Sequence, residues 1–155
     1  MNPEQKTAGQ PIVSRLIVVE GKDDAALMRA MTRYTNLVGT FVYDANGLGN
    51  FGRVVKNLSA GLDLNPQRSE TKRIETQQVR ADQLTHLLLL ADADRSAEKA
   101  FREQCKVLSL FRDTQNQMLA LPDQPLQWSE PSDWGLRTGI VILPINKQDG
   151  ALEDL

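Results

Sequence analysis

The sequence predicts an α/β fold, in which a mostly parallel β-sheet carries helices on both of its faces. First, segments 16–19, 87–90 and 141–143 are short, almost continuously apolar runs, which are typical of strands buried on both sides. Second, the segments between these runs contain apolar residues at helical spacing, so right-handed helical crossovers should connect the strands. We therefore expect the three runs to be neighbouring strands of one sheet.

The first part of the chain is expected to alternate between strand and helix. A strand at 13–19 precedes a helix at 23–35, and a second strand at 40–43 ends at Asp44. The glycine-rich loop that follows leads into a helix at 51–62. The apolar residues at helical spacing in the first of these helices are Ala26, Leu27, Ala30, Met31 and Tyr34.

The middle of the chain is polar until the third strand begins. Residues 63–84 contain a break at Asn65-Pro66, after which Ser69 fits as the cap of a solvated helix. The third strand is expected at 85–91, and Ser96 then opens a helix that runs to about residue 112. The apolar stripe of this helix consists of Ala100, Phe101, Cys105, Leu108 and Phe111.

The last part of the chain contains one more strand. Residues 113–137 hold three prolines and both tryptophans, which predicts an irregular connection with a short strand at 118–121. A strand at 138–143 ends before a proline, and a turn at 148–150 precedes the start of a helix at 151–155.

Length and composition restrict the class of protein. At 155 residues the chain is expected to form a single domain over 12–155, after a disordered leader at 1–11. No apolar stretch approaches the roughly 20 residues of a membrane helix, and no secretory signal is visible, so we expect a cytoplasmic protein without a membrane contact. A net charge of −2 gives no overall attraction to nucleic acid. The single cysteine excludes an internal disulfide, and the single histidine, His86, is expected to be a strand-edge residue with an ordinary partner.

Carboxylates follow two of the apolar runs. Glu20 comes directly after the first strand, and Asp92 and Asp94 come directly after the third. Carboxyl ends of parallel strands share one edge of a sheet, where α/β proteins place ligands. Ionised carboxylates that lie close together repel unless a cation lies between them, and hard divalent cations prefer oxygen ligands. The sequence therefore predicts an acidic metal site at this edge.

The first of these acids opens a Glu-Gly-Lys-Asp-Asp turn at 20–24. Gly21 would allow a tight turn, and Asp23 and Asp24 are equally explained as caps of the following helix. Glu20 is different, because desolvation at the end of an apolar strand favours its neutral form and suits a general acid or base.

A glycine-rich segment and several basic residues follow the second strand. Gly47 and Gly49 belong to a G-x-G-x-x-G pattern, but the next strand ends about 40 residues on instead of the usual ~20, so we do not expect dinucleotide binding. The loop is expected to shape the rim of the site. Arg53, Lys56 and Arg95 are candidate phosphate contacts, although a solvated face explains the local basic excess better.

Taken together, these residues resemble the Toprim domain, which is shared by topoisomerases, primases, recombination-mediator proteins and overcoming-lysogenisation-defect nucleases. The marks of that domain are a Glu-Gly turn after the first strand and an Asp-x-Asp after a later one, and segments 18–24 and 90–94 match them. The sequence is most similar to small Toprim-like proteins related to the nuclease branch. Segments 47–50 and 150–154 fit their glycine-rich segment and their late Gly-x-Leu-Glu-Asp. The similarity spans about residues 12–155 and implies a Rossmann-like fold.

The resemblance implies roles for individual residues. Glu20 would be the acid/base residue and would help to organise the metal, while Asp92 and Asp94 would bind Mg²⁺ or Mn²⁺. Glu153 and Asp154 would serve a second ion. The auxiliary residues of the site would be Gly21, Asp24, Gly47 and Gly49.

The chain departs from the family pattern in two places. Residues 63–84 are longer than the usual linker, and the chain stops directly after Glu153 and Asp154, where relatives continue. We therefore expect a truncated C-terminus and weak nuclease activity, because ligands close to a chain end bind an ion weakly. This activity should prefer Mn²⁺, whose geometric demands are looser than those of Mg²⁺.

The sequence thus predicts a Mg²⁺-dependent, nuclease-like domain that acts on phosphodiester bonds in nucleic acid. One alternative is a non-catalytic Toprim-like module that recruits a partner protein. The other is a phosphatase of the haloacid-dehalogenase type, which also places Asp-x-Asp after an apolar strand. That family expects the pair after its first strand and a glycine next, and Arg95-Ser96 does not match.

Overall fold

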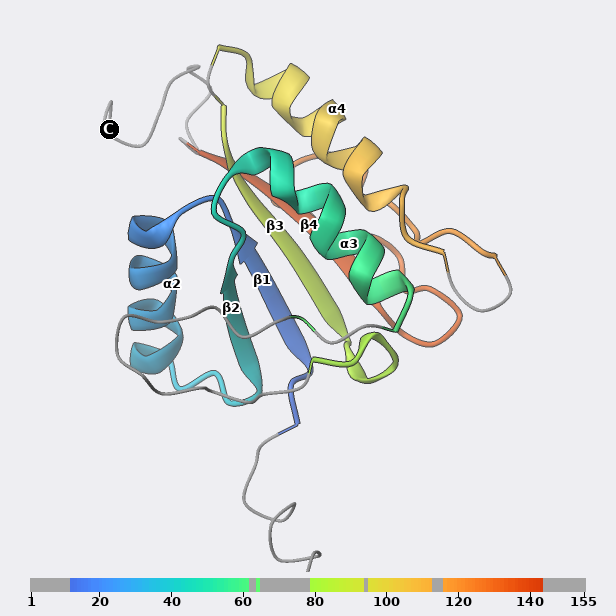
Figure 1. Cartoon of the computed structure of the whole chain (residues 1–155), viewed down its shortest axis with the longest axis horizontal. Coiled ribbons are helices and arrows are strands. Elements are labelled where there is room, and N and C mark those ends of the chain that lie inside the picture. The colour runs from blue at the N-terminus through green and yellow to red at the C-terminus, as the bar shows by residue number, and fades with distance from the viewer. Residues whose placement is uncertain (1–11, 62–63, 65–78, 94, 113–115, 144–155) are drawn as a thin grey trace, which may run out of the picture.

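A parallel sheet forms the centre of the protein. The computed structural model describes residues 12–61, 64, 79–93, 95–112 and 116–143 (Figure 1). Within these ranges the sheet has the strand order β2-β1-β3-β4, and every neighbouring pair is parallel, which confirms the predicted α/β fold. The strands are β1 (Arg15–Val19), β2 (Thr40–Asp44), β3 (His86–Asp92) and β4 (Arg137–Leu143). The helices are α2 (Lys22–Tyr34), α3 (Phe51–Ser59) and α4 (Ala97–Leu108).

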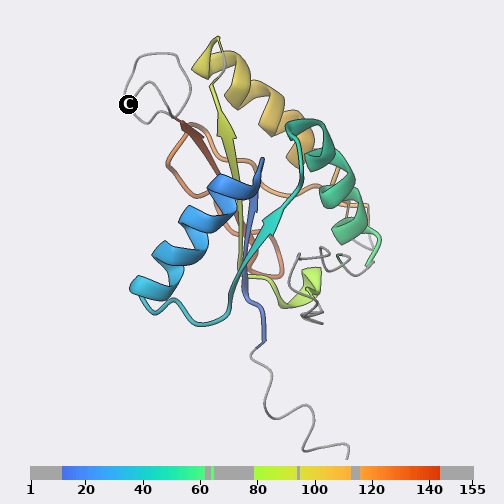
Figure 2. The same ribbon diagram turned by 60° about the vertical axis from the view of Figure 1, so that its left-hand side comes forward.

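Helices cover both faces of this sheet, as the sequence predicts. Helix α2 lies on one face, beside β1 and β2, and helices α3 and α4 lie on the other face (Figures 1 and 2). Successive residues of a strand point to opposite faces, so Leu16 and Val18 join the larger core under α3 and α4, whereas Ile17 and Val19 join the smaller core under α2. Burial on both faces explains why the strands are continuously apolar.

Helix α2 presents a different face to the sheet from the one its apolar pattern predicts. Ala25 is buried and Met28 is partly buried against the sheet, but Leu27, Met31 and Tyr34 are exposed. All five residues at the predicted helical spacing are exposed, so that side of the helix does not face the core. Ala25 and Met28 instead join the smaller core, which contains apolar residues from β1, β2, β3 and β4.

Two helices are shorter than predicted. Helix α3 ends at Ser59 instead of residue 62, because Ala60 caps it and Gly61 takes a positive φ of 72°. Helix α4 begins after the predicted cap, Ser96, whose hydroxyl accepts a hydrogen bond from the Lys99 N–H, but it ends at Leu108 instead of residue 112. Beyond Leu108 the chain forms tighter turns, in which the Leu110 and Phe111 N–H groups donate three residues back.

The connection before β4 also differs from the prediction. Residues 116–121 contain no strand, so the expected strand at 118–121 is wrong in the described part of that segment. Leu119 is buried there, but Ala120 is held by a side chain, since its carbonyl accepts a hydrogen bond of 2.7 Å from the Thr138 hydroxyl. A short 3₁₀ turn at Ala81–Gln83, which the sequence analysis does not predict, precedes β3.

Some predicted features lie outside the described residues. They are the leader at 1–11, the helix from Ser69, the turn at 148–150 and the helix at 151–155. Within the described ranges, no helix combines the length and apolar character needed to cross a membrane.

Candidate acidic site at the carboxyl edge of the sheet

Two of the predicted acids lie at the same edge of the sheet. Strands β1 and β3 are parallel neighbours, and their register pairs Val19 with Leu90. Glu20 follows Val19 directly, and Asp92 is the last residue of β3. Both therefore lie at the carboxyl edge, within two residues of the last β1–β3 pair.

The environment of Glu20 is partly closed. The residue is only partly exposed, and its Oε2 atom is shielded from solvent. Its backbone carbonyl accepts a hydrogen bond of 2.7 Å from the Gly47 N–H, which ties the end of β1 to the glycine-rich loop after β2. The predicted rim loop thus lies directly beside Glu20.

The glycine-rich loop is held in one shape by its own residues. Gly47 has a φ of 125°, a region that favours glycine, whereas Gly49 lies within the 3₁₀ turn Leu48–Asn50. The Asn50 side-chain amide donates to the carbonyls of Ala45 and Asn46, at 2.9 and 3.0 Å. The loop is therefore a defined wall at the carboxyl edge.

The turn that begins α2 corrects one detail of the prediction. Gly21 has an extended backbone, with φ −152°, and a Cβ there would meet only the Asp24 carboxylate, at 4.0 Å. The turn therefore does not need a glycine for its conformation. Asp23 and Asp24 do not act as the N-cap, because Gly21 occupies that position without a side-chain cap; they lie in the first turn, where the helix dipole favours acids.

A third acid at this edge has no assigned role in the sequence analysis. Asp44 ends β2, is paired with Val19 and is buried. Its Oδ1 atom accepts a hydrogen bond of 2.8 Å from the Asn46 N–H, so it holds the start of the glycine-rich loop. The signal that could have found it is its position at the end of a strand, the same signal that singled out Glu20.

The predicted metal site includes three further acids. Asp94, Glu153 and Asp154 lie outside the described residues. Within the described ranges, no three histidine, cysteine or acidic side chains form a group that could hold a metal ion. Glu20 and Asp92 nevertheless provide oxygen donors of the type that Mg²⁺ and Mn²⁺ prefer, so the donor chemistry at this edge fits such an ion.

The three candidate phosphate contacts are exposed, and two of them lie near the same edge. Arg53 lies in the first turn of α3, directly after the glycine-rich loop, and Lys56 lies one turn further on. Arg95 is exposed between the end of β3 and the start of α4. Arg53 and Arg95 therefore follow directly on segments that border the acids.

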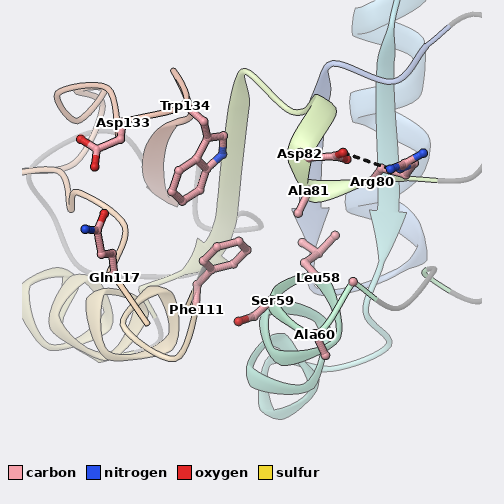
Figure 3. Close-up of a pocket in the computed structure, with 11 residues that line it drawn as sticks. Leu58, Ser59, Ala60, Arg80, Ala81, Asp82, Phe111, Gln117, Asp133 and Trp134 are labelled. Carbon is pink, nitrogen blue, oxygen red and sulfur yellow. Dashed lines mark hydrogen bonds and ion pairs between the residues drawn. The ribbon is translucent and has the colours of Figure 1, made fainter. Parts of the chain in front are cut away.

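A cavity of about 610 Å³ lies at the opposite end of the molecule, before the amino-terminal end of β3 (Figure 3). Phe111 and Trp134 stack in its wall, with ring centroids 6.0 Å apart. Asp133 lies near Trp134, and an ion pair of 3.0 Å between Arg80 and Asp82 lies across the cavity. No pattern in the sequence predicts this cavity.

The single histidine has the ordinary partners that the sequence analysis predicts. Its Nδ1 atom lies 2.9 Å from the Thr85 hydroxyl, and its ring meets Trp128 edge to face, with centroids 4.8 Å apart. Burial lowers the pKa of His86 below its ordinary value of 6.5, and the charges of Arg15 and Arg137 lower it further.

This shift predicts a pH dependence of stability. Below pH 6.5, His86 is protonated to a greater extent in the unfolded chain than in the folded chain. Protonation therefore favours unfolding. The corresponding stability is fully present above pH 6.5 and is lost as the pH falls through the lower pKa of the folded state. Urea unfolding from about pH 5 to pH 7.5 should show a smaller rise in stability with pH for His86→Gln than for the wild type; equal slopes would contradict the prediction.

The fold and this edge define an α/β protein with an acidic carboxyl edge. The family described as "Protein of unknown function (DUF3226)" matches residues 14–155, so the chain belongs to that family. No curated protein and no solved structure matches the chain.

Proposed function

We propose that the protein is a Toprim-type, metal-dependent enzyme that cleaves phosphodiester bonds in nucleic acid. The observation that supports this proposal is the delivery of Glu20 and Asp92 by adjacent parallel strands to one edge, beside a structured glycine loop. Carboxylates gathered at the carboxyl edge of a parallel sheet are a common basis for binding a divalent ion and a phosphate.

Each residue of the edge would have a separate role in the reaction. A bound Mg²⁺ or Mn²⁺ ion supplies positive charge that polarises the phosphate. Asp92 would hold this ion, with Asp94 as its partner. Glu20, whose Oε2 atom is shielded from solvent, would take the proton from the attacking water, and Arg53 would hold a neighbouring phosphate.

Metal binding can be tested without any substrate. Mg²⁺ should raise the melting temperature of the protein, because an ion that binds only the folded state stabilises it by mass action. Asp92→Asn should remove most of this rise. Asp123→Asn is the matched control, since Asp123 is exposed in the connection before β4, and it should respond as the wild type does. An unchanged response in Asp92→Asn would contradict the role of Asp92 as a ligand.

Turnover needs a separate assay. Supercoiled plasmid and a single-stranded RNA should each be incubated with Mg²⁺ or Mn²⁺, and cleavage should depend on Asp92. Cleavage that persists in Asp92→Asn would show that the activity comes from elsewhere.

The cavity at the other end of the molecule favours a second function, a non-catalytic module that recruits a partner protein. Its aromatic wall and polar rim would accept an apolar side chain of that partner. N-acetyl-phenylalaninamide should then shift the NMR signals of the lining residues. Ala60→Trp should block the cavity, whereas Ala30→Trp, at an exposed alanine on α2, should not. Shifts that persist in Ala60→Trp would contradict this use of the cavity.

A further inference from the structure

Three basic residues lie side by side at the amino-terminal edge of the sheet, opposite the acids. The register pairs Arg15 of β1 with His86 of β3, and His86 with Arg137 of β4. Paired residues of neighbouring parallel strands point to the same face, and the strands lie about 4.8 Å apart. Arg15, His86 and Arg137 therefore form one row on the α2 face, which we call the basic row.

The basic row carries the positive charge of two guanidinium groups, one on each side of His86. Burial lowers the pKa of His86 below 6.5, and the charges of Arg15 and Arg137 lower it further, so the imidazole is mostly neutral at pH 7. Within the described residues, no carboxylate forms an ion pair with either arginine. The two guanidinium charges therefore lack a negative partner in the described part of the chain, and an anionic ligand would supply one.

Each arginine is held in place by a hydrogen bond to a backbone carbonyl and keeps further N–H donors for a ligand. The Arg15 Nη1 atom donates to the Val38 carbonyl at 3.3 Å, and the Arg137 Nη1 atom donates to the Ser129 carbonyl at 3.2 Å. A guanidinium has five N–H donors, so each arginine retains others for a ligand.

An aromatic ring extends the row on the same face. Trp128 contacts His86 edge to face and lies over Gly139, where a Cβ atom would come within 2.9 Å of the indole. The segment that carries Trp128 is tied to β4, because the Ser129 N–H donates to the Thr138 carbonyl at 2.8 Å. The side chain of Trp128 is nevertheless 48% exposed, so part of the indole is available for stacking.

We propose that the basic row and Trp128 bind single-stranded nucleic acid, with the arginines on its phosphates and one base stacked on the indole. Guanidinium groups match phosphate oxygens, and sites for single strands combine positive charge with aromatic rings. The proposal rests on the proposed function, since the bound strand would be its substrate. His86 and Asp92 are six residues apart along β3, so the row would hold the strand about 20 Å from the acidic edge.

Binding should be measured by the fluorescence anisotropy of a fluorescein-labelled oligo-dT of about 20 nucleotides, with EDTA present so that cleavage cannot interfere. The double variant Arg15→Gln/Arg137→Gln should bind at least tenfold more weakly. The slope of log affinity against log salt should fall by about 1.4, or roughly 0.7 for each lost phosphate contact. The control Arg102→Gln/Lys106→Gln removes the same charge from exposed positions on α4 and should bind as the wild type does.

The aromatic part of the site has its own variants. Trp128→Leu should weaken binding by about fivefold or more, because it removes the ring on which one base stacks, and Trp128→Phe should retain most of the affinity. Circular dichroism and the melting temperature will identify any variant that fails to fold. If the double arginine variant fails to fold, the single substitutions Arg15→Gln and Arg137→Gln replace it.

The outcomes separate this proposal from its rivals and from the proposed function. Wild-type affinity in the double arginine variant, or an equal loss in the α4 control, would overturn it. The proposal would also be overturned if polyglutamate or inorganic phosphate competed as effectively, per unit of charge, as unlabelled oligo-dT. Loss of binding in the double variant while cleavage persists in Asp92→Asn would support the basic row and contradict the acidic site. Normal binding in the double variant with metal-dependent cleavage lost in Asp92→Asn would do the reverse.

Discussion

Leu89→Ala is expected to lower the free energy of unfolding by about 2–5 kcal/mol, because it removes a large side chain from the centre of the core and leaves a cavity. Leu89 is 0% exposed on β3, and the register pairs it with Val18 of β1 and Ile140 of β4, which are also fully buried. Its side chain belongs to the larger core under α3 and α4, where close packing leaves little room for neighbours to fill the space.

Urea unfolding, followed by circular dichroism, measures this effect. Leu126→Ala makes the same chemical change at a residue that is 57% exposed, and it should alter the stability by no more than about 0.5 kcal/mol. A loss below about 1 kcal/mol for Leu89→Ala would show that the strand order or the packing of β3 is different from the one described here.

Glu20→Gln is expected to reduce the rate of nucleic-acid cleavage by about 10²–10⁴-fold, the usual contribution of a positioned acid or base. Glutamine keeps the shape of the side chain but cannot accept a proton, so the loss reports on proton transfer. The rise in melting temperature with Mg²⁺ should be retained better in Glu20→Gln than in Asp92→Asn, since the proposal assigns ion binding mainly to Asp92.

Single-turnover cleavage with Mg²⁺ or Mn²⁺ measures the rate, and Asp23→Asn is the control. Asp23 is exposed in the first turn of α2, close in sequence to Glu20, and its substitution should leave the rate almost unchanged. A rate for Glu20→Gln within about threefold of the wild type would contradict the assignment of Glu20 as the acid/base residue.

The sheet and the position of the acids could be predicted because both follow from local patterns and one topological rule. Segments 16–19 and 87–90 are apolar without alternation, which identifies strands covered on both faces, and both lie within observed strands. Helical connections make such strands parallel, and parallel strands end at the same edge. The shared edge of Glu20 and Asp92 follows from these points alone.

The helices show where local patterns were insufficient. The spacing of Leu27, Met31 and Tyr34 identifies a helix but not the side of it that meets the sheet, and these residues are exposed. Gln104 shows the converse, because a polar residue of α4 is only 2% exposed and its Oε1 atom has no hydrogen-bond partner among the described residues. Periodicity reports which residues could leave water, whereas burial depends on the surface that the rest of the chain offers.

The sequence by itself determined the fold class, the four strands of the described sheet and the edge at which Glu20 and Asp92 lie. These depend on hydrophobic patterns within short segments and on the chirality of the crossovers. Only the tertiary structure decided the basic row, the position of Trp128 over Gly139 and the cavity beside Trp134. Arg15, His86 and Arg137 are far apart in the sequence, and nothing near any of them specifies the others. They meet because the register of three strands is set by the packing of the whole sheet, which no local pattern encodes.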